Sequence, residues 1–502
     1  VRKTIVFLVN MMGDRIKSSL ILLCLIGIIC RLNANTVENV IKDSQIKASG
    51  TLIGDKGLLA VPIMQNEFMP NPIMGVGVSY DGKVYVTETT RQQREEISLI
   101  QSPFLHEKDM ELISTKAKRD WIIKNYSSRI AARQGVRDYN GDGKVDIRDL
   151  SERSEKIYTL HDQNADGVFD KATLFADGFN NVLTGVAHSV TPIGGHVYTT
   201  IIPDLWKLTD TNGDGMADSR ESIAHGFAPH IGYGNHDLHS IVQGYDGKIY
   251  WSMGDRGLNV LTKEGKRVSN PHSGCILRCN PDGSEFEVFA TGLRNCQYFD
   301  FDNYGNIFAI DHDADFQGER ERLVYLPEGS DSGWRMYYQY RNTTLVKAAR
   351  DDLYNPWLAE KMWLPFHGGQ PSHLLPAIEN SWNAPAAFSF QPGVALAGAF
   401  RNHFFLGGMG NIRAFKMIAD GAGFKREGDH ILIQGLGAQV LTSAFGPDGR
   451  LYFTLWRPSR GMSQLWTLQA ANHTQEMIHV KEILAKDPKK QKVDKLLELL
   501  GH

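Results

Sequence analysis

The stretch YDGKIYWSMGD at residues 245–255 combines an Asp-Gly turn with a short strand in which buried and exposed positions alternate. The same phrase returns in five further places: YDGKVYVTE at 80–88, PDGRLYFTLW at 447–456, GGHVYTTI at 194–201, NYGNIFAID at 303–311 and FRNHFFLGG at 400–408. An Asp-Gly turn supplies the positive φ of a tight hairpin, and the alternation gives each strand one buried face. Repeats of this kind predict an all-β fold, a six-bladed β-propeller over residues 50–470. Two stacked sandwiches would not explain six similar hairpins.

Two segments do not follow the strand pattern. Residues 91–135 contain RQQREEISLIQ and KDMELISTKAKRDWIIKNYSSRIAARQG, which are rich in helix formers with charges at i and i+4. We expect a helical insertion in the first blade. Residues 473–502 are similar in composition and rich in Lys, which predicts a helical tail whose charges form a solvated face.

Composition excludes several classes of protein. The chain has 502 residues, with 54 Lys and Arg against 57 Asp and Glu, and a formal net charge of −3. This balance argues against nucleic acid as a partner. Aromatic residues make up 10% of the chain, enough to bury a large core and to exclude disorder.

The N-terminal residues resemble a secretory leader. Arg15 and Lys17 precede an apolar run from Leu20 to Cys30, and Ala34 offers a small residue for cleavage. This order predicts a signal peptide over residues 1–34 and a protein exported to the periplasm or the cell surface. The alternative is an uncleaved leader that anchors the chain.

Three cysteines follow the leader. Cys275 and Cys279 lie on one expected strand and cannot pair with each other, whereas either could reach Cys296. Three buried thiols are the equal alternative. No Cys-x-x-Cys-His occurs, so the chain carries no covalent c-type haem.

Three acidic loops between residues 138 and 221 have the spacing of calcium-binding loops. Oxygen-bearing side chains fall at positions 1, 3, 5, 9 and 12, with Gly at position 6, although the second loop ends in Thr173. Calcium prefers such sets of oxygen ligands, and it would stiffen the loops. Asx turns without metal are the alternative. The predicted ligands are Asp138, Asn140, Asp142, Asp146 and Asp149, then Asp162, Asn164, Asp166 and Asp170, then Asp210, Asn212, Asp214, Asp218 and Glu221.

A histidine and an acid are predicted to meet in the third repeat. The turn at residues 244–247 joins two strands, so a residue before the first strand lies beside a residue after the second. His236 and Asp255 hold these two places, and a carboxylate there would orient the imidazole as a general base. His225, His230 and His239 lie nearby, so a zinc site is the competing chemistry, although no His-Glu-x-x-His spacing supports it.

Arg294 and Asn295 begin the next repeat at the same expected rim. A cluster of four carboxylates follows, Asp311, Asp313, Asp315 and Glu319. Carboxylates this close either bind a cation or repel one another. A solvated acidic loop is the alternative to a metal site.

The order of these motifs resembles a known family. His236, GDRG at 254–257, GLRNCQ at 292–297, the acidic loop and SGW at 332–334 resemble the soluble quinoprotein sugar dehydrogenases of glucose/sorbosone type. The phrases LFADGFNNVLTGVAH, DLWKLTDTNGDGMADSRESIAHGF and ERLVYLPEGSDSGWR are more similar still to the membrane-bound dehydrogenase family of Planctomycetes and Verrucomicrobia. The resemblance covers about residues 65–470. It implies a six-bladed propeller that uses calcium and pyrroloquinoline quinone (PQQ).

The resemblance also implies residue roles. His236 would be the base, Asp255 would orient it, and Arg294 would contact substrate and quinone. Asn295, Asp313 and Ala314 would lie at the cofactor, with calcium near Asp311 to Asp315. The family holds the quinone carboxylates with a lysine and a pair of arginines, but GGMGN at 407–411 and GLGAQVLTS at 435–443 contain no Lys or Arg. This departure argues against tight PQQ binding.

Three hypotheses follow. The first is an exported, calcium-dependent, quinoprotein-like dehydrogenase that oxidises a sugar or another alcohol and passes electrons to a separate acceptor, such as a c-type cytochrome on another chain. The second is a non-catalytic propeller that binds a glycan or a protein. The third is a metal-dependent hydrolase or lactonase.

Overall fold

The computed structural model describes residues 51–52, 57–64, 69, 71–92, 95–164, 167–312, 319–340, 355–380, 384–391, 393, 395–457 and 462–470. The predicted signal peptide (1–34) and helical tail (473–502) lie outside the described residues. The described residues from 52 to 470 belong to one compact unit, and the description below concerns this unit alone.

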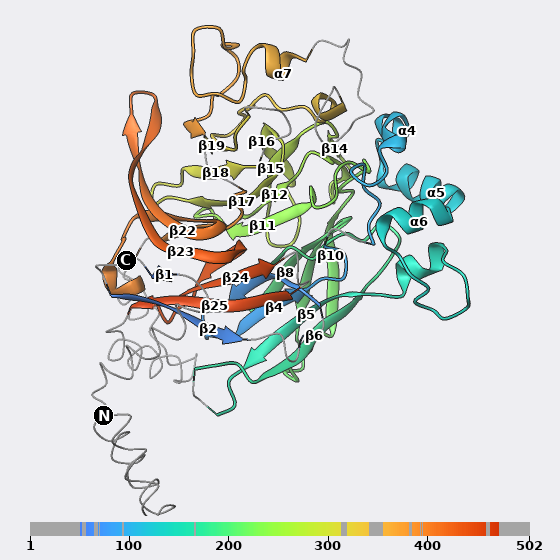
Figure 1. Ribbon diagram of the computed structural model, residues 1–502, viewed down its shortest axis with the longest axis horizontal. Coiled ribbons are helices and arrows are strands. Elements are labelled where there is room, and N and C mark those ends of the chain that lie inside the picture. The colour runs from blue at the N-terminus through green and yellow to red at the C-terminus, as the bar shows by residue number, and fades with distance from the viewer. Residues whose placement is uncertain are drawn as a thin grey trace, which may run out of the picture. The chain divides into compact units, whose positions relative to one another are not determined.

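Four antiparallel sheets have four strands each, and their strands follow one another along the chain (Figure 1). The first sheet holds β3 (Ile73–Val78), β4 (Val84–Glu88), β5 (Glu155–His161) and β6 (Lys171–Phe179), and the second holds β7 (Ser189–Ile193), β8 (His196–Ile201), β9 (Asp204–Thr209) and β10 (Ser219–His225). The third sheet holds β11 (Leu238–Gln243), β12 (Ile249–Met253), β15 (Gly274–Cys279) and β16 (Glu287–Leu293). The fourth sheet holds β17 (Cys296–Phe301), β18 (Ile307–Asp311), β19 (Arg322–Tyr325) and β20 (Glu379–Asn380). The third sheet also carries a small hairpin, β13 (Leu258–Leu261) with β14 (Arg267–Asn270).

A larger fifth sheet joins the two ends of the compact unit. Its strands run in the order β2 (Leu58–Met64), β25 (Met462–Ala470), β24 (Leu451–Arg457), β23 (Gly423–Phe445), β22 (His403–Asp420) and β21 (Phe388–Gln391). The short β1 (Thr51–Leu52) precedes them along the chain. Because β2 pairs with β25, the first long strand of the unit is hydrogen-bonded to the last one. This pairing closes the circle of sheets.

The protein is an all-β propeller, as predicted, and its innermost strands form a closed ring. Going around the ring, each strand contacts the next, in the order β3, β7, β11, β17, β21, β23 and back to β3. The six Asp-Gly-type phrases provide β4, β8, β12, β18, β22 and β24, which are the neighbours of these inner strands. Each repeat therefore supplies the turn and the second strand of an inner hairpin.

The number of sheets differs from the predicted number of blades. The described residues form five sheets of four or more strands, whereas the sequence predicts six blades. The physical reason is that the last two repeats share one sheet through the long strands β22 and β23. The rings of Phe404 and Phe415, both in β22, have centroids 6.5 Å apart. Eleven residues of straight strand would span about 36 Å, so β22 folds back on itself, close to Gly410 at φ +77°.

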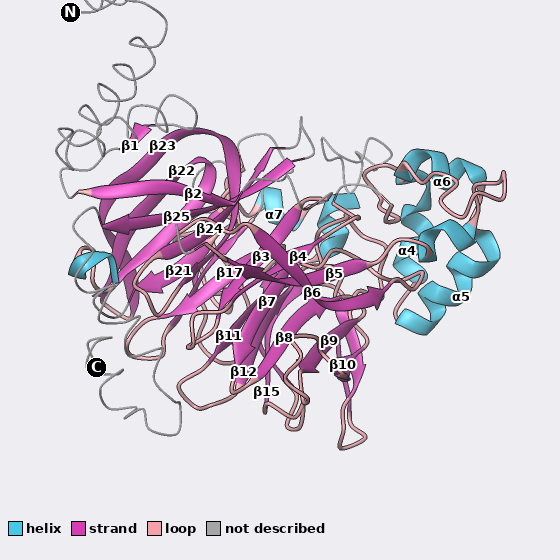
Figure 2. Cartoon of the chain, turned by 90° about the horizontal axis from the view of Figure 1, so that it is seen from below, coloured by secondary structure: helices cyan, strands magenta, loops and turns pink. Residues whose placement is uncertain are grey.

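Helices are few and gather in the predicted insertion, residues 91–135 (Figure 2). There the chain forms η2 (Pro103–Leu105), α4 (His106–Glu111), α5 (Thr115–Asn125) and α6 (Ser128–Gln134), whereas residues 95–102 are not helical. Ser114 caps α5 by accepting a hydrogen bond from the amide of Ala117, and α6 ends at Gly135 with φ +70°. The remaining helices of the described chain are short: η3 (Ile147–Ser151), η4 (Met336–Tyr340), α7 (Pro356–Ala359) and η5 (Ala395–Gly398).

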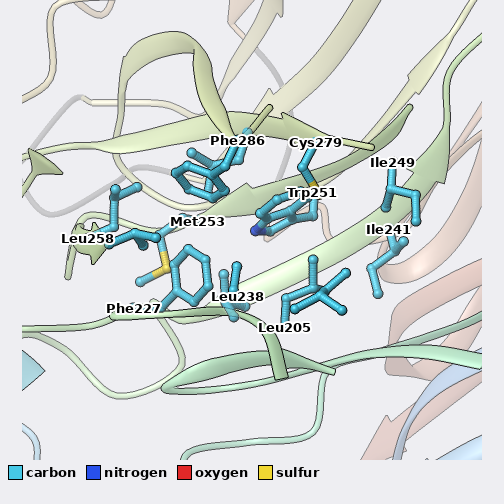
Figure 3. Packing of buried hydrophobic residues seen from close by; sticks show 14 of the residues in the cluster. Leu205, Phe227, Leu238, Ile241, Ile249, Trp251, Met253, Leu258, Cys279 and Phe286 are labelled. Carbon is cyan, nitrogen blue, oxygen red and sulfur yellow. The ribbon is translucent and has the colours of Figure 1, made fainter. Parts of the chain in front are cut away.

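A hydrophobic cluster between the second and third sheets fixes the strands that lead to His236 and Asp255 (Figure 3). Leu238 and Met253 are register partners in β11 and β12, and both are fully buried. Trp251 lies on the same hairpin and packs against Phe286. The ends of this hairpin are therefore held by close packing, which transmits small changes in geometry.

Three cysteines lie within the described residues. Cys275, Cys279 and Cys296 are buried free thiols, which is the second of the two predicted states. Burial raises the pKa of the Cys275 thiol to about 12.

Within the described part of the chain, none of the helices has the length and apolar character needed to cross a bilayer.

Candidate active site

A cavity of about 310 Å³ lies where the inner strands begin or end. Its lining includes residues of four of the five sheets, such as Met74 of β3, His239 of β11, Tyr298 of β17 and Gln439 of β23. His188, just before β7, completes the circle. A cavity on the axis of a ring of strands is a common place for a ligand site, because several loops converge there.

His236 and Asp255 form a hydrogen-bonded pair at this cavity. Nδ1 of His236 lies 2.7 Å from Oδ1 of Asp255, which confirms the predicted contact. His236 lines the cavity, whereas Asp255 is completely buried behind it. Since a carboxylate accepts, Nδ1 carries the proton and Nε2 is the nitrogen with a free electron pair for a molecule in the cavity.

The hairpin β11–β12 explains this geometry. Leu238 pairs with Met253, so the residues just outside this pair meet at one end of the sheet. A Cβ added at Gly254 would lie 2.6 Å from the backbone carbonyl carbon of His236. Only glycine therefore allows the two turns to approach so closely.

Trp334 binds the acid of the His236–Asp255 pair, and the sequence did not predict this role. Its indole Nε1–H donates to Oδ2 of Asp255 at 3.0 Å, and the ring is fully buried. The guanidinium carbon of Arg294 lies 5.8 Å from the Trp334 ring centroid. Trp334 therefore contacts both the acid and the cation of the site. It belongs to the SGW phrase, which was the only sequence feature that could have drawn attention to it.

Arg294 and Asn295 line the cavity next to His236, as predicted. Arg294 donates from Nη1 to the carbonyl oxygen of His312 at 2.8 Å. The side-chain oxygen of Asn295 accepts from Nε2 of His239 at 3.0 Å. Both residues therefore have fixed side chains that face the same space as His236.

Asp311 holds this segment in place. Its carboxylate accepts the backbone N–H groups of Arg294 and Asn295, each at 2.9 Å, and pairs with the buried guanidinium of Arg322. Both oxygens of Asp311 are thus engaged within the protein. Of the other acids in the predicted cluster, Glu319 accepts from the indole N–H of Trp357. Asp313, Ala314 and Asp315 lie outside the described residues.

Three further histidines border the cavity. Burial lowers the pKa of His239 to about 4 and that of His312 to about 3, so both are neutral near pH 7. Burial also lowers the pKa of His188, whose ring lies 4.0 Å from that of His239. Nε2 of His188 and Nε2 of His312 are buried without a hydrogen-bond partner among the described residues. Such atoms favour a polar ligand in the cavity. His188 ends the phrase LFADGFNNVLTGVAH, but the sequence did not assign it a role.

The histidines that suggested zinc do not converge. Nδ1 of His225 pairs with Asp204 at 2.8 Å, and Nδ1 of His230 donates to the backbone oxygen of Asp109 at 2.8 Å. Within the described ranges, no group of three or more His, Cys, Asp or Glu is placed so that it could hold a metal ion. The four histidines thus have four separate sets of partners.

The three acidic loops share one backbone arrangement. In the first loop Asp138 accepts from the amides of Gly141 and Gly143, at 2.7 and 2.8 Å. In the third loop Asp210 accepts from Gly213 and Gly215, at 2.7 and 2.9 Å. These are Asx-type turns, and calcium binding to the loops stays a prediction.

Most of the other predicted ligands also contact groups of their own loops. Asn140 and Asn212 accept from the amides of Asp142 and Asp214, Asp149 from those of Tyr139 and Asp146, Asp162 from that of Gly167, Asp170 from that of Gln163, and Asp218 from that of Thr211. Asp142 and Asp146 pair with Arg148, and Glu221 pairs with Lys263. Asn164 is described as well, whereas Asp166 lies outside the described residues.

The fold and the site can now be compared with known proteins. The chain belongs to the family described as "Domain of unknown function (DUF7133)", whose model matches residues 72–456. No curated protein matches the chain.

Three solved structures with a similar fold are described as sugar dehydrogenases or a domain of one. An oxidoreductase described as a glucose dehydrogenase, from Thermus thermophilus, is 14% identical, with 82% of this chain and 100% of that chain covered and a TM-score of 0.48. The PQQ-bound aldose sugar dehydrogenase from Streptomyces coelicolor is 12% identical, with 83% and 99% covered and a TM-score of 0.47. The PQQ domain of pyranose dehydrogenase from Coprinopsis cinerea is 10% identical, with 84% and 97% covered and a TM-score of 0.46. At these identities, function has to be inferred from this chain's own residues.

Proposed function

We propose that this protein is an oxidoreductase that oxidises a hydroxyl group of a sugar or another small alcohol in the axial cavity. The observation that carries the proposal is the pair formed by His236 and Asp255. A buried carboxylate at 2.7 Å holds Nδ1 of an imidazole that lines the cavity, which leaves Nε2 available as a base. Removing a hydroxyl proton while hydride leaves the same carbon is the chemistry that such a base supports.

Each residue then has a defined task. Nε2 of His236 takes the hydroxyl proton, and Asp255 stabilises the imidazolium that forms. Arg294 presents a guanidinium to the cavity, and it can stabilise negative charge that develops on the substrate oxygen. Asn295 and the neutral His239 hold each other in place beside the substrate space.

The hydride needs a two-electron acceptor, and PQQ is the one that the family resemblance implies. PQQ carries three carboxylates, whereas Arg294 is the only Lys or Arg among the described residues that line the cavity. The stretch 435–443 contributes the uncharged Gln439 and Leu441. The described lining therefore does not match the charge of PQQ. We propose instead a quinone-type acceptor with fewer negative charges, or one whose charge a bound cation neutralises.

A hydrolase or lactonase is the second candidate. The uncharged side chains at Gln439 and Leu441 leave room for a neutral ester or lactone, and the same His236–Asp255 pair could activate water against it. This reaction needs no electron acceptor. The two candidates differ in their product, so chemistry separates them.

The remaining parts of the proposal concern the whole protein. We propose that calcium binds the three acidic loops between residues 138 and 221, because their side-chain spacing suits an oxygen-liganded cation. We also propose that the protein is exported, because residues 1–34 resemble a signal peptide, and that a c-type cytochrome on another chain receives the electrons.

A variant pair tests the proposal. Dye-linked turnover of sugars and polyols should fall at least about a hundredfold in His236→Ala, because the base is lost. The matched control is His225→Ala, since His225 also pairs with a carboxylate at 2.8 Å but is exposed and does not line the cavity. His225→Ala should keep the activity of the unmodified protein. Turnover retained by His236→Ala would remove this residue from the mechanism.

A further inference from the structure

A cluster of buried charges lies immediately beside the His236–Asp255 pair. Arg256 follows Asp255 in the sequence and is only 1% exposed. Its Nη1 contacts two carboxylates, those of Asp237 and Glu96. Asp237 follows His236, whereas Glu96 belongs to the insertion at residues 91–135. One guanidinium thus connects the insertion to the turn that holds His236 and Asp237 and to the turn that holds Asp255.

These two turns are therefore joined by two neighbouring side-chain contacts. His236 is hydrogen-bonded to Asp255, and Asp237 forms an ion pair with Arg256. The amide of Gly254 also donates to the backbone oxygen of Asp237 at 2.9 Å. Any shift of Arg256 relative to Asp237 would consequently change the distance between His236 and Asp255.

The insertion holds the loop that precedes His236 at further points. Lys118 of α5 is buried and donates from Nζ to the backbone oxygens of Ala228 and His230, at 3.1 and 2.9 Å. Other bonds also run between the insertion and this loop, among them the amide of Leu99 to the oxygen of Gly232 at 2.9 Å, the amide of Gly232 to Asp109 at 3.0 Å, and the amide of Gly234 to Oγ of Ser98 at 2.8 Å. Residues 228–234 are thus bonded to the insertion, whereas the amides of Gly226 and Phe227 donate to the backbone oxygen of Pro203, between β8 and β9.

The loop needs this support. Asn235, directly before His236, has φ +68°, a left-handed conformation that costs a residue other than glycine about 1 kcal/mol or more. Such a conformation persists only where surrounding contacts determine it. The carbonyl oxygen of Asn235 accepts from Nε2 of His239 at 3.1 Å and from Nδ2 of Asn295 at 3.4 Å, and the insertion holds Gly234, directly before it, through Ser98.

We propose that Arg256, held by Glu96, is a positioning residue that keeps His236 aligned with Asp255, so that the helical insertion is part of the support of the active site. This inference rests on the proposed function of His236 as a base. Burial raises the pKa of Glu96 to about 7 and lowers that of Lys118 to about 7, as expected for charges held without solvent.

The test uses two substitutions at one position. Glu96→Ala removes the contact with Arg256, whereas Glu96→Gln keeps a side-chain oxygen that can accept from it. In Glu96→Ala, kcat should fall about tenfold or more with KM within about threefold, because a small misplacement of a catalytic group is costly. Nitrogen NMR of the His236 ring should show a mixture of tautomers in place of the Nδ1-protonated form. Glu96→Gln should restore both properties.

The control removes a comparable ion pair elsewhere. Asp448 pairs with Arg450 at 2.6 Å, shielded from solvent, in the turn between β23 and β24. Asp448→Ala should leave both kcat and the His236 tautomer unchanged. If Glu96→Ala does not fold, Arg256→Lys takes its place, with the same expected loss.

The two proposals can fail separately. A normal His236 tautomer together with normal kcat in folded Glu96→Ala would overturn the positioning role. If His236→Ala keeps its turnover, the proposed function fails, while the NMR result still reports on the positioning.

Discussion

Asp255→Asn is the substitution that probes the candidate base most sharply. The carboxylate accepts two hydrogen bonds, from Nδ1 of His236 at 2.7 Å and from Nε1 of Trp334 at 3.0 Å. An amide has one oxygen, so it can accept only one of these bonds. If that oxygen faces Trp334, the amide nitrogen faces His236 and favours the tautomer protonated on Nε2, which cannot act as a base.

The size of the effect follows from electrostatics. A unit charge about 4 Å from the imidazolium, at an effective dielectric constant of about 20, stabilises it by about 4 kcal/mol. Because each 1.36 kcal/mol corresponds to a factor of ten in rate, loss of this stabilisation predicts a fall of kcat/KM by about a thousandfold. The free energy of unfolding should change less, by about 1–3 kcal/mol, because one buried hydrogen bond is lost.

The assay is dye-linked turnover, combined with urea unfolding to confirm the fold. Asp204→Asn is the matched control, because Asp204 pairs with His225 at 2.8 Å away from the cavity. It should keep full turnover. If Asp255→Asn turned over within about threefold of the unmodified protein, the carboxylate would have no role in orienting or stabilising the base.

Three further outcomes are expected. Met253→Ala should lower the free energy of unfolding by about 2–5 kcal/mol in urea titrations, because Met253 is fully buried; a loss below about 1 kcal/mol would contradict the described packing. Burial lowers the pKa of His239 to about 4, so between pH 6.5 and 4 the unfolded chain binds one proton that the folded chain does not bind. The free energy of unfolding should therefore fall by about 3 kcal/mol for this group as the pH drops from 6.5 towards 4. His239→Gln should remove that part of the pH dependence, and an unchanged slope would show that another group causes it. EDTA should lower the melting temperature by more than about ten degrees and added calcium should restore it; a constant melting temperature would end the calcium proposal.

The fold was largely predictable, because its main elements are local. Each Asp-Gly-type phrase, such as that at 245–255, carries its own turn and alternation, and each forms the second strand of an inner hairpin. The number of sheets was not predictable in the same way. It depends on the fold-back of β22 near Gly410 and on the length of β23, which join two repeats in one sheet. No local sequence pattern indicates which strand pairs with such a long strand.

Contacts in the candidate site were predictable only between residues that lie close together in the sequence. His236 and Asp255 flank one hairpin, so their meeting followed from the turn between them. Trp334 reaches Asp255 from 79 residues away, and Glu96 reaches Arg256 from 160 residues away. These contacts result from closure of the ring of sheets and from docking of the insertion. Single-sequence patterns contain no information on such contacts.

Mass spectrometry of the product tests the central claim most directly. Purified protein is incubated with calcium, an artificial electron acceptor and a panel of sugars, polyols and lactones, and with the His236→Ala variant in parallel. The account predicts that a substrate loses two hydrogens and that the variant leaves it unchanged. A gain of one water would identify a hydrolase instead, and a panel that remains unchanged with the unmodified protein would contradict oxidation at this cavity and favour a binding role.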